Sequence, residues 1–136
     1  MTPYLFFDGR AAEAIDYYRE TLGAQVAMVM RFKDNPSPEY NPPGMDDKVM
    51  HSCLNVGGGP VMISDGNCGG RPTFSGFSLT YDAKDEDEAK RRFDALAKDG
   101  KVEMPLGETF FARAFGSVKD KFGVSWMVIA GAKNPS

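Results

Sequence analysis

Histidine and cysteine are the scarcest reactive residues of this 136-residue chain, which has one histidine, His51, and two cysteines, Cys53 and Cys68. A zinc clip or a disulfide framework needs several such residues at short, regular spacings, so we expect neither. A site that needs two or three imidazoles would have to take them from a second subunit. The sequence therefore argues against the commonest metal sites of proteins.

Excess positive charge and long apolar runs are also missing. The formal net charge is -3 at pH 7, so no basic surface predicts binding to nucleic acid. No apolar run approaches the ~20 residues that a membrane-spanning helix needs. No basic segment followed by an apolar one marks a signal peptide. We therefore expect a cytoplasmic protein whose partners include neither nucleic acid nor a membrane.

What the chain does have is an ordinary globular composition, 42% hydrophobic and 26% charged. A chain of this length is large enough to bury a core without disulfides or metals. We therefore expect residues 1–136 to form a single domain.

The segment from Pro3 to Phe32 predicts a strand, an amphipathic helix and a second strand. Residues 4–7 are a short apolar run, which favours a buried strand. The helix is indicated by apolar residues that recur at helical spacing: Ala11, Ala14, Ile15, Tyr18 and Leu22. Asp8 and Gly9 are suited to its first turn and Gly23 to its last, and a strand over 24–32 follows.

The rest of the first half predicts a loop and a hairpin. Residues 33–48 carry four prolines and no periodicity, so they form a loop, either a lid or a mobile excursion. Strands over 49–56 and 61–64 are joined by a glycine-rich turn. Residues 1–66 form the first module, and the polar segment 65–72 is the predicted linker.

The second half repeats this order. A strand over 73–81 is followed by a helix that begins at the capping box of Asp85 and Glu88 and ends at Gly100. Three further strands are expected: 102–106, 110–118 and 124–130. Strand, helix and three strands, met twice, form an internal repeat. The sequence therefore predicts an α+β fold of two βαβββ modules, the second over residues 73–131.

His51 and Cys53 lie two residues apart on a predicted strand, so their side chains share a face. One interpretation is a thiol nucleophile beside a base. The other is a satisfied imidazole and a small inert thiol, which the usual burial of free cysteine favours.

Ser78, Thr80 and Arg113 are further candidates. Ser78 and Thr80 alternate with apolar residues, so their hydroxyls face away from the apolar side; they orient a ligand there or only bond to neighbouring strands. Arg113 is the one cation of the strand over 110–118. It either holds an anionic ligand by a bidentate contact or is an exposed residue whose stem lies on aromatic rings.

Three segments resemble the PhnB-like branch of the vicinal-oxygen-chelate superfamily, which includes glyoxalase I, bleomycin-resistance proteins and extradiol dioxygenases. They are PYLFFDGxAAEAIDYYxxxLG at 3–23, MHSCLNVGGGPVMISD at 50–65 and MPLGETFFARAFGSVKDKFGVSWMV at 104–128. The resemblance implies a curved eight-stranded mixed sheet and a homodimer that pairs modules across chains. Some members of the branch carry a methyltransferase name linked to demethylubiquinone, but the sequence offers no motif for a methyl-donor nucleotide.

The resemblance also locates four metal-ligand positions, which fall at Pro3, Ile63, Gly76 and Met127. None of these side chains ligates a catalytic divalent ion by the usual nitrogen, oxygen or thiolate chemistry. We therefore predict no metal and no other cofactor. The chain also departs from its branch: where members have D-P-F-G-H-x-W, Lys121 and Val124 replace the proline and the histidine. Any activity that depends on that histidine is in doubt for this chain.

Two functions of different classes remain open, with a third that is purely structural. The first is metal-independent binding of a small apolar or aromatic ligand. The second is a glyoxalase-type lyase or isomerase with a divalent metal or His51. A module for protein interaction alone would have no enclosed cavity. For the first function the sequence names these ligand-binding residues: His51, Cys53, Ser78, Thr80, Phe111, Arg113 and Met127.

Overall fold

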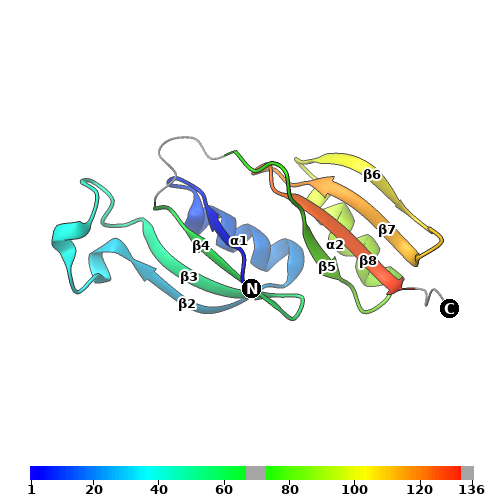
Figure 1. Ribbon diagram of the computed structural model, residues 1–136, viewed down its shortest axis with the longest axis horizontal. Helices are drawn as coiled ribbons and strands as arrows, with labels where there is room; N and C mark the ends of the chain where they lie inside the picture. The colour runs from blue at the N-terminus through cyan, green and yellow to red at the C-terminus, as the bar shows by residue number, and fades with distance from the viewer. Residues whose placement is uncertain (67–72, 133–136) are drawn as a thin grey trace. The chain divides into compact units, whose positions relative to one another are not determined.

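The computed structural model of the chain describes residues 1–66 and 73–132 (Figure 1). The chain divides into two compact units, with the boundary between residues 72 and 73. The first unit contains β1 (Tyr4–Phe6), α1 (Ala11–Leu22), β2 (Gln25–Arg31), η1 (Phe32–Asp34), η2 (Pro38–Tyr40), β3 (Val49–Val56) and β4 (Gly59–Ser64). The second contains β5 (Leu79–Asp82), α2 (Glu86–Ala97), β6 (Lys101–Gly107), β7 (Ala112–Lys119) and β8 (Ser125–Ala132).

Each unit is one βαβββ module with a four-stranded mixed sheet. The strand order is β1-β4-β3-β2 in module one and β5-β8-β7-β6 in module two. In each sheet the first strand runs parallel to the last, and the other neighbours are antiparallel. The α+β class and the two βαβββ modules are therefore confirmed. Folding of both modules as a single domain stays a prediction.

The core of each module lies between its helix and one sheet face. In α1 the five residues of the predicted stripe are all buried, and Leu5, Leu54 and Ile63 of the sheet are buried as well. In α2 the buried residues are Ala89, Phe93 and Leu96. Burying one large apolar side chain contributes about 1.5–3 kcal/mol, so these stripes explain why each helix lies on its sheet.

The first turn of α1 is capped by Asp65, not by Asp8 as the sequence suggested. Asp8 adopts a left-handed backbone conformation (φ 48°), and no side chain within the helix caps its start. Instead the Asp65 carboxylate accepts the N–H groups of Gly9 (2.7 Å), Ala11 (2.8 Å) and Val49 (3.0 Å). Asp65 is buried and so belongs to module one. Residues 67–72 of the predicted linker, with Cys68, lie outside the described residues.

Helix α2 begins as predicted and ends slightly differently. Asp85 accepts the N–H of Glu88 at 2.8 Å, and the Glu88 carboxylate accepts the N–H of Lys84 at 2.9 Å. At the other end the left-handed residue is Asp99 (φ 63°) rather than Gly100. A β-carbon at Gly100 would overlap backbone carbonyl oxygens. Gly100 is therefore needed for close packing rather than for its backbone conformation.

Two strands of module two are shorter at their start than the sequence predicts. The strand expected over 73–81 begins only at Leu79, after a bend at Gly76 (φ 79°). The strand expected over 110–118 begins at Ala112. There the Thr109 hydroxyl accepts the N–H of Phe111 (3.3 Å) and of Ala112 (3.1 Å), which holds these residues in a turn.

The segment between β2 and β3 is hydrogen-bonded at its base and within itself. The N–H of Phe32 donates to the carbonyl of Lys48 (3.0 Å), and the Asn41 side chain donates to the carbonyl of Phe32 (2.7 Å). Two short 3-10 turns, η1 and η2, lie within it. The predicted loop over 33–48 is therefore a folded excursion.

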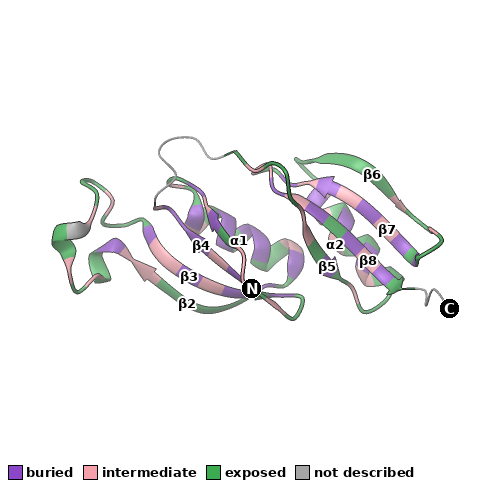
Figure 2. Cartoon of the chain, viewed as in Figure 1, coloured by how far each residue is buried: buried purple, intermediate pink, exposed green. Residues whose placement is uncertain are grey.

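Burial alternates along β3, β7 and β8 but not along β2 and β6. Figure 2 shows buried and less buried residues alternating on β3, β7 and β8, whereas β2 and β6 are mostly exposed. One sheet face in each module is thus covered by a helix, and the opposite face is not. Among the described residues, no helix is long and apolar enough to cross a membrane.

Candidate functional site

The candidate site lies on what we call the open faces, the sheet faces opposite α1 and α2. Strand register places the side chains of each open face in rows. In module one a row crosses the sheet through Tyr4, Met62, Cys53 and Met28. In module two the equivalent row is Thr80, Met127, Ser117 and Met104. The methionines of the first row lie on β4 and β2, and those of the second row lie on the equivalent strands β8 and β6. The internal repeat therefore extends to the residue types of the open faces.

Tyr4 and His51 are joined on the open face of module one. The Tyr4 hydroxyl lies 2.7 Å from His51 Nδ1, and the Tyr4 ring stacks on Phe6 with centroids 4.9 Å apart. Tyr4 is 38% exposed. The expectation of a buried strand over residues 4–7 is therefore wrong for Tyr4 and Phe6 and right for Leu5 and Phe7, which are buried. The rings of Tyr4 and Phe6 and the imidazole of His51 therefore form a mostly apolar surface on this face.

A hollow of about 270 Å³ lies beside this pair. Its walls include Tyr4, Phe6 and Met50 from the sheet and Pro42 from the excursion between β2 and β3. A segment that only connected β2 to β3 would not need to line a hollow, so this excursion does more than join the two strands. The hollow is smaller than the ~300–1,000 Å³ of common ligand pockets. It could therefore enclose part of a ligand rather than a whole drug-sized one.

His51 and Cys53 share the open face, as their spacing predicted. The hydrogen bond that the structure gives His51 is to Tyr4, and Cys53 is a partly exposed free thiol. A satisfied imidazole agrees with the less reactive of the two interpretations. A partly exposed thiol differs from the buried one that this interpretation assumed.

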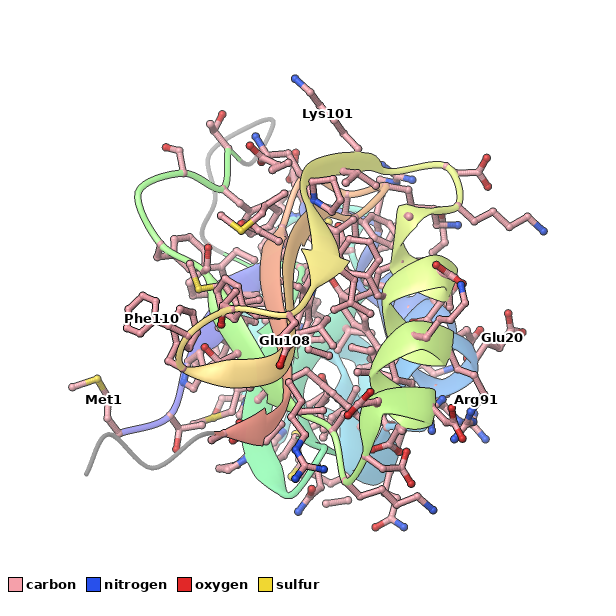
Figure 3. All side chains as sticks on the ribbon, turned by 90° about the vertical axis from the view of Figure 1, so that its right-hand side faces the viewer. Met1, Glu20, Arg91, Lys101, Glu108 and Phe110 are labelled. Atoms are coloured by element: carbon pink, nitrogen blue, oxygen red, sulfur yellow. The ribbon has the colours of Figure 1, made fainter. Side chains whose placement is uncertain are left out.

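Phenylalanine rings gather on the open face of module two. The rings of Phe110 and Phe111 are 5.1 Å apart, and those of Phe111 and Phe115 are 4.9 Å apart, each pair edge-on. Figure 3 shows Phe110 projecting on the side of the sheet opposite α2, and its side chain is 90% exposed. Exposed aromatic rings in contact with one another are typical of a surface that binds another molecule.

Arg113 of β7 lies on this aromatic face, two residues after Phe111 and two before Phe115. Its aliphatic stem packs over Gly131 of β8, where a β-carbon would come within 3.0 Å of the arginine stem. Gly131 also has a positive φ of 62°, which other residues rarely adopt. Gly131 thus makes room for the stem, and Arg113 as a whole stays exposed.

Ser78, Thr80 and Met127 complete the candidates of module two. The Ser78 hydroxyl lies 2.7 Å from the Ser125 hydroxyl, so it bonds to a neighbouring strand. Thr80 is exposed, and it pairs in register with Met127. The structure therefore brings Thr80, Met127, Phe111 and Arg113 to one face, with Ser78 at its margin.

The metal site of the superfamily does not fit these residues. Ile63, at one of the four expected ligand positions, is fully buried under α1, and Met62 takes the open-face position that corresponds to Met127. Moving the expected ligand position by one residue, from Ile63 to Met62, thus replaces one side chain that does not ligate a catalytic divalent ion with another. Within residues 1–66 and 73–132, no group of three or more His, Cys, Asp and Glu is placed to hold a metal ion.

The sequence interpretation missed Tyr4, Phe6 and the two methionine rows. Alternation within residues 4–7 was the available signal, because two aromatic side chains must face away from Leu5 and Phe7. The rows depend on register between strands far apart in sequence, which no local pattern gives.

Comparisons with known proteins agree with this architecture along the whole chain. A family model described as 3-demethylubiquinone-9 3-methyltransferase matches residues 1–129. Protein YjdN of Escherichia coli (strain K12) is 40% identical over 144 residues, which cover 100% of this chain and 98% of that protein.

Solved structures extend the likeness to three dimensions. Protein PA1353 from Pseudomonas aeruginosa superposes with a TM-score of 0.83 at 38% identity, over 98% of both chains. A PhnB protein from Bacillus cereus gives a TM-score of 0.76 at 30% identity, over 96% of this chain and 98% of that one. A glyoxylase/bleomycin resistance protein/dioxygenase domain from Frankia sp. EAN1pec shares the fold at 15% identity and a TM-score of 0.65, over 98% of this chain and 90% of that one. This chain therefore belongs to the 3-demethylubiquinone-9 3-methyltransferase family, whose members include PhnB-like proteins, and it has the fold of the glyoxalase/bleomycin-resistance/dioxygenase proteins.

Proposed function

We propose that this protein binds a small apolar or aromatic ligand on its open faces without using a metal ion. The observation that carries the proposal is the cluster of Phe110, Phe111 and Phe115, two of them exposed, on the same sheet face as the exposed Arg113. The proposed contacts on module two are Ser78, Thr80, Phe111, Arg113 and Met127, and those on module one are His51 and Cys53.

The chemistry of the aromatic face defines the class of ligand. Phenylalanine rings and methionine thioethers contact aromatic or aliphatic groups favourably and adapt to different shapes. The guanidinium of the exposed Arg113 adds a planar donor that matches a carboxylate, sulfonate or phosphate. An aromatic or apolar molecule with one anionic group fits this combination best.

Two fluorescent probes with related rings test this directly. One is 8-anilinonaphthalene-1-sulfonate, and the other is N-phenyl-1-naphthylamine, which lacks the sulfonate. We expect both probes to bind the native protein with raised emission. Arg113→Ala should weaken binding of the sulfonate probe by roughly tenfold or more, since a hydrogen bond to a charged group contributes about 1.5–3 kcal/mol. Binding of the neutral probe should not change. Phe111→Ala should weaken binding of both.

Arg91→Ala is the matched control, because Arg91 is an exposed arginine of α2 that points away from the strands (Figure 3). It removes the same charge and should leave the binding of both probes unchanged. Equal loss of the sulfonate probe in Arg91→Ala and Arg113→Ala would overturn the assignment of Arg113. Stoichiometric nickel, zinc, iron or manganese in the purified protein would overturn metal independence.

A further inference from the structure

Three sulfur side chains stand side by side on the open face of module one. Strand register sets Cys53 of β3 directly between Met62 of β4 and Met28 of β2. Opposed residues on one face of an antiparallel pair have Cβ atoms about 4.5–5.5 Å apart. Methionine has a long, unbranched and flexible side chain, so both thioethers can reach a point above the Cys53 thiol. Three sulfur atoms from three strands can therefore converge on one ion.

A bulge in β2 produces this row. Val26 pairs with Leu54, and the next pair is Met28 with Cys53, so one residue of β2 is skipped. With regular pairing Ala27 would stand opposite Cys53, and the row would lose its outer sulfur atom. Bulges often re-aim a side chain beside a functional site. The irregularity of β2 thus has a specific consequence, which is to bring a thioether next to the thiol.

Module two repeats the row and the bulge but not the thiol. Its row runs through Met127, Ser117 and Met104 on the equivalent strands. The register shift after Val102 puts Met104, in place of Glu103, opposite Ser117. The two rows therefore share their strands, their bulge and both methionines. They differ in the central residue, which is a thiol in module one and a hydroxyl in module two.

The sulfur atoms of the first row do not serve as core filler. Met28 is 38% exposed, and Met62 and Cys53 are partly exposed. The core of module one lies on the other side of the sheet, where Val26 and Val29 line a groove beside α1. The usual structural role of methionine, filling gaps in a core, therefore does not explain this row.

We propose that Met28, Cys53 and Met62 bind one Cu(I) ion. Soft thiolate and thioether ligands select Cu(I), whereas zinc takes thiolate, imidazole or carboxylate ligands. The ligand is the thiolate, so the Cys53 thiol releases its proton to solvent when the ion binds. The missing superfamily site is one for divalent ions, so its absence and this proposal are compatible. The hydroxyl of Ser117 is a poor ligand for a soft ion, so the second row should not bind it.

This inference goes beyond the proposed function and can fail separately from it. A copper ion would occupy the Cys53 contact of module one and leave the aromatic face of module two unchanged. The copper-loaded chain should therefore still bind the sulfonate probe through Phe111 and Arg113. Failure of the probe experiments would leave the copper site standing, and failure of copper binding would leave the aromatic face standing.

Anaerobic titration of the purified chain with Cu(I), in competition with bicinchoninate, tests the site. We expect one tightly bound ion per chain, which Cys68→Ser retains and Cys53→Ser loses. Met28→Leu and Met62→Leu preserve the apolar bulk and remove the sulfur. Each should raise the dissociation constant roughly tenfold or more, since even changes beside the ligands of a metal site cost about 10–100-fold.

Met104→Leu is the matched control for Met28→Leu. Both methionines lie on outer strands after a bulge, and they are 48% and 38% exposed. Met104→Leu should bind Cu(I) as the native chain does. Equal affinity in Cys53→Ser and the native chain, or equal affinity in Met28→Leu and Met104→Leu, would overturn the proposal.

A gain of binding makes the test independent of any damage to folding. Ser117→Cys gives module two the same three sulfur atoms and should add a second tightly bound ion. Met104→Leu, neutral in the native chain, should then weaken this second ion as Met28→Leu weakens the first. Arg91→Cys is the control, because it places a thiol on the exposed side of α2, a helix that contains no methionine. An equal gain in Arg91→Cys, or no gain in Ser117→Cys, would overturn the site.

X-ray absorption at the copper edge identifies the ligand atoms directly. We expect sulfur neighbours and no nitrogen neighbour. His51 lies two residues from Cys53 on the same face, and its Nδ1 is 2.7 Å from the Tyr4 hydroxyl. A nitrogen neighbour that disappears in His51→Ala would overturn the all-sulfur site.

Discussion

Among the residues that the structure describes, each module buries one aspartate, and the two differ in the segments that they join. Asp65 and Asp120 are 2% and 3% exposed. The partners of Asp120 are the N–H groups of Phe122 and Val124 and the indole N–H of Trp126, all within six residues. The partners of Asp65 lie 16 to 56 residues away. One carboxylate organises a hairpin, and the other ties a helix start and a strand to the end of β4.

This difference separates local from long-range order. The donors to Asp120 lie within one hairpin, close to it in sequence. If the carboxylate is removed, a water molecule or a rearranged turn can therefore supply these donors with another acceptor. The donors of Asp65 come from three segments that meet only in the folded module. We therefore expect the free energy of unfolding to depend more on Asp65 than on Asp120.

Asp65→Ala should have the largest effect. It leaves the N–H groups of Gly9, Ala11 and Val49 without their acceptor in a buried setting, and one such loss costs about 1–3 kcal/mol. We expect the free energy of unfolding to fall by roughly 4 kcal/mol, measured by urea denaturation with far-ultraviolet circular dichroism. Asp8→Asn is the control at the same helix end, with an expected change below about 0.5 kcal/mol. Equal losses in the two variants would contradict the assignment of the cap.

The same variant tests the prediction of a single domain. The one tryptophan, Trp126, lies in module two and reports on that module alone. If the chain unfolds as one cooperative domain, Asp65→Ala lowers the urea midpoint read from Trp126 fluorescence by as much as the midpoint read from circular dichroism. An unchanged fluorescence midpoint would show two modules that unfold independently.

Asp120→Ala should have the second largest effect, roughly 3 kcal/mol, because two backbone donors and the indole N–H lose a buried acceptor. Trp126 fluorescence gives both the stability and a change in native emission, since the indole loses its partner. Asp120→Asn retains one carbonyl oxygen and should recover part of the loss. If Asp120→Ala lost more unfolding free energy than Asp65→Ala, the proposal that long-range hydrogen bonds contribute more to stability than local ones would be wrong.

Asp85→Ala should cost about 1 kcal/mol, the usual cost of losing an exposed helix cap. Asp85 accepts only a local N–H, that of Glu88, in an exposed setting. Asp85→Ser retains an acceptor at the cap and should restore most of the stability in the same urea measurement. If Asp85→Ala lost as much unfolding free energy as Asp65→Ala, burial of the aspartate would not determine how much its hydrogen bonds contribute to stability.

These cases show which parts of the fold a sequence can predict. The cap of α2 was predictable because Asp85 and Glu88 stand three residues apart, and the apolar stripe of α1 was predictable from its period. The cap of α1 was not, because Asp65 lies 54 residues after Ala11 and looks like part of a polar linker. Local chemistry is visible in a sequence, whereas a bond between distant segments appears only with the topology.

The candidate site follows the same rule. Alternation placed His51 with Cys53, and Thr80 opposite Tyr81, because both inferences need a single strand. The late start of β7, which leaves Phe110 and Phe111 in a turn, depends on the Thr109 hydroxyl competing with the strand. The Tyr4–His51 contact joins β1 to β3 and needed the sheet order first.

Among these variants, Tyr4→Phe should change the free energy of unfolding least. The Tyr4 hydroxyl makes one hydrogen bond, to His51, on an exposed face where water can replace it. A net hydrogen bond contributes about 0.5–1.5 kcal/mol, and exposure places this one at the low end. A double-mutant cycle of Tyr4→Phe with His51→Ala, read from urea denaturation, should give a coupling energy below about 0.5 kcal/mol. Because the ring of Tyr4 still stacks on Phe6 in the variant, the cycle isolates the hydroxyl. A coupling energy above about 2 kcal/mol would place this pair with the buried carboxylates, and would mean that the open face of module one excludes water in the native protein.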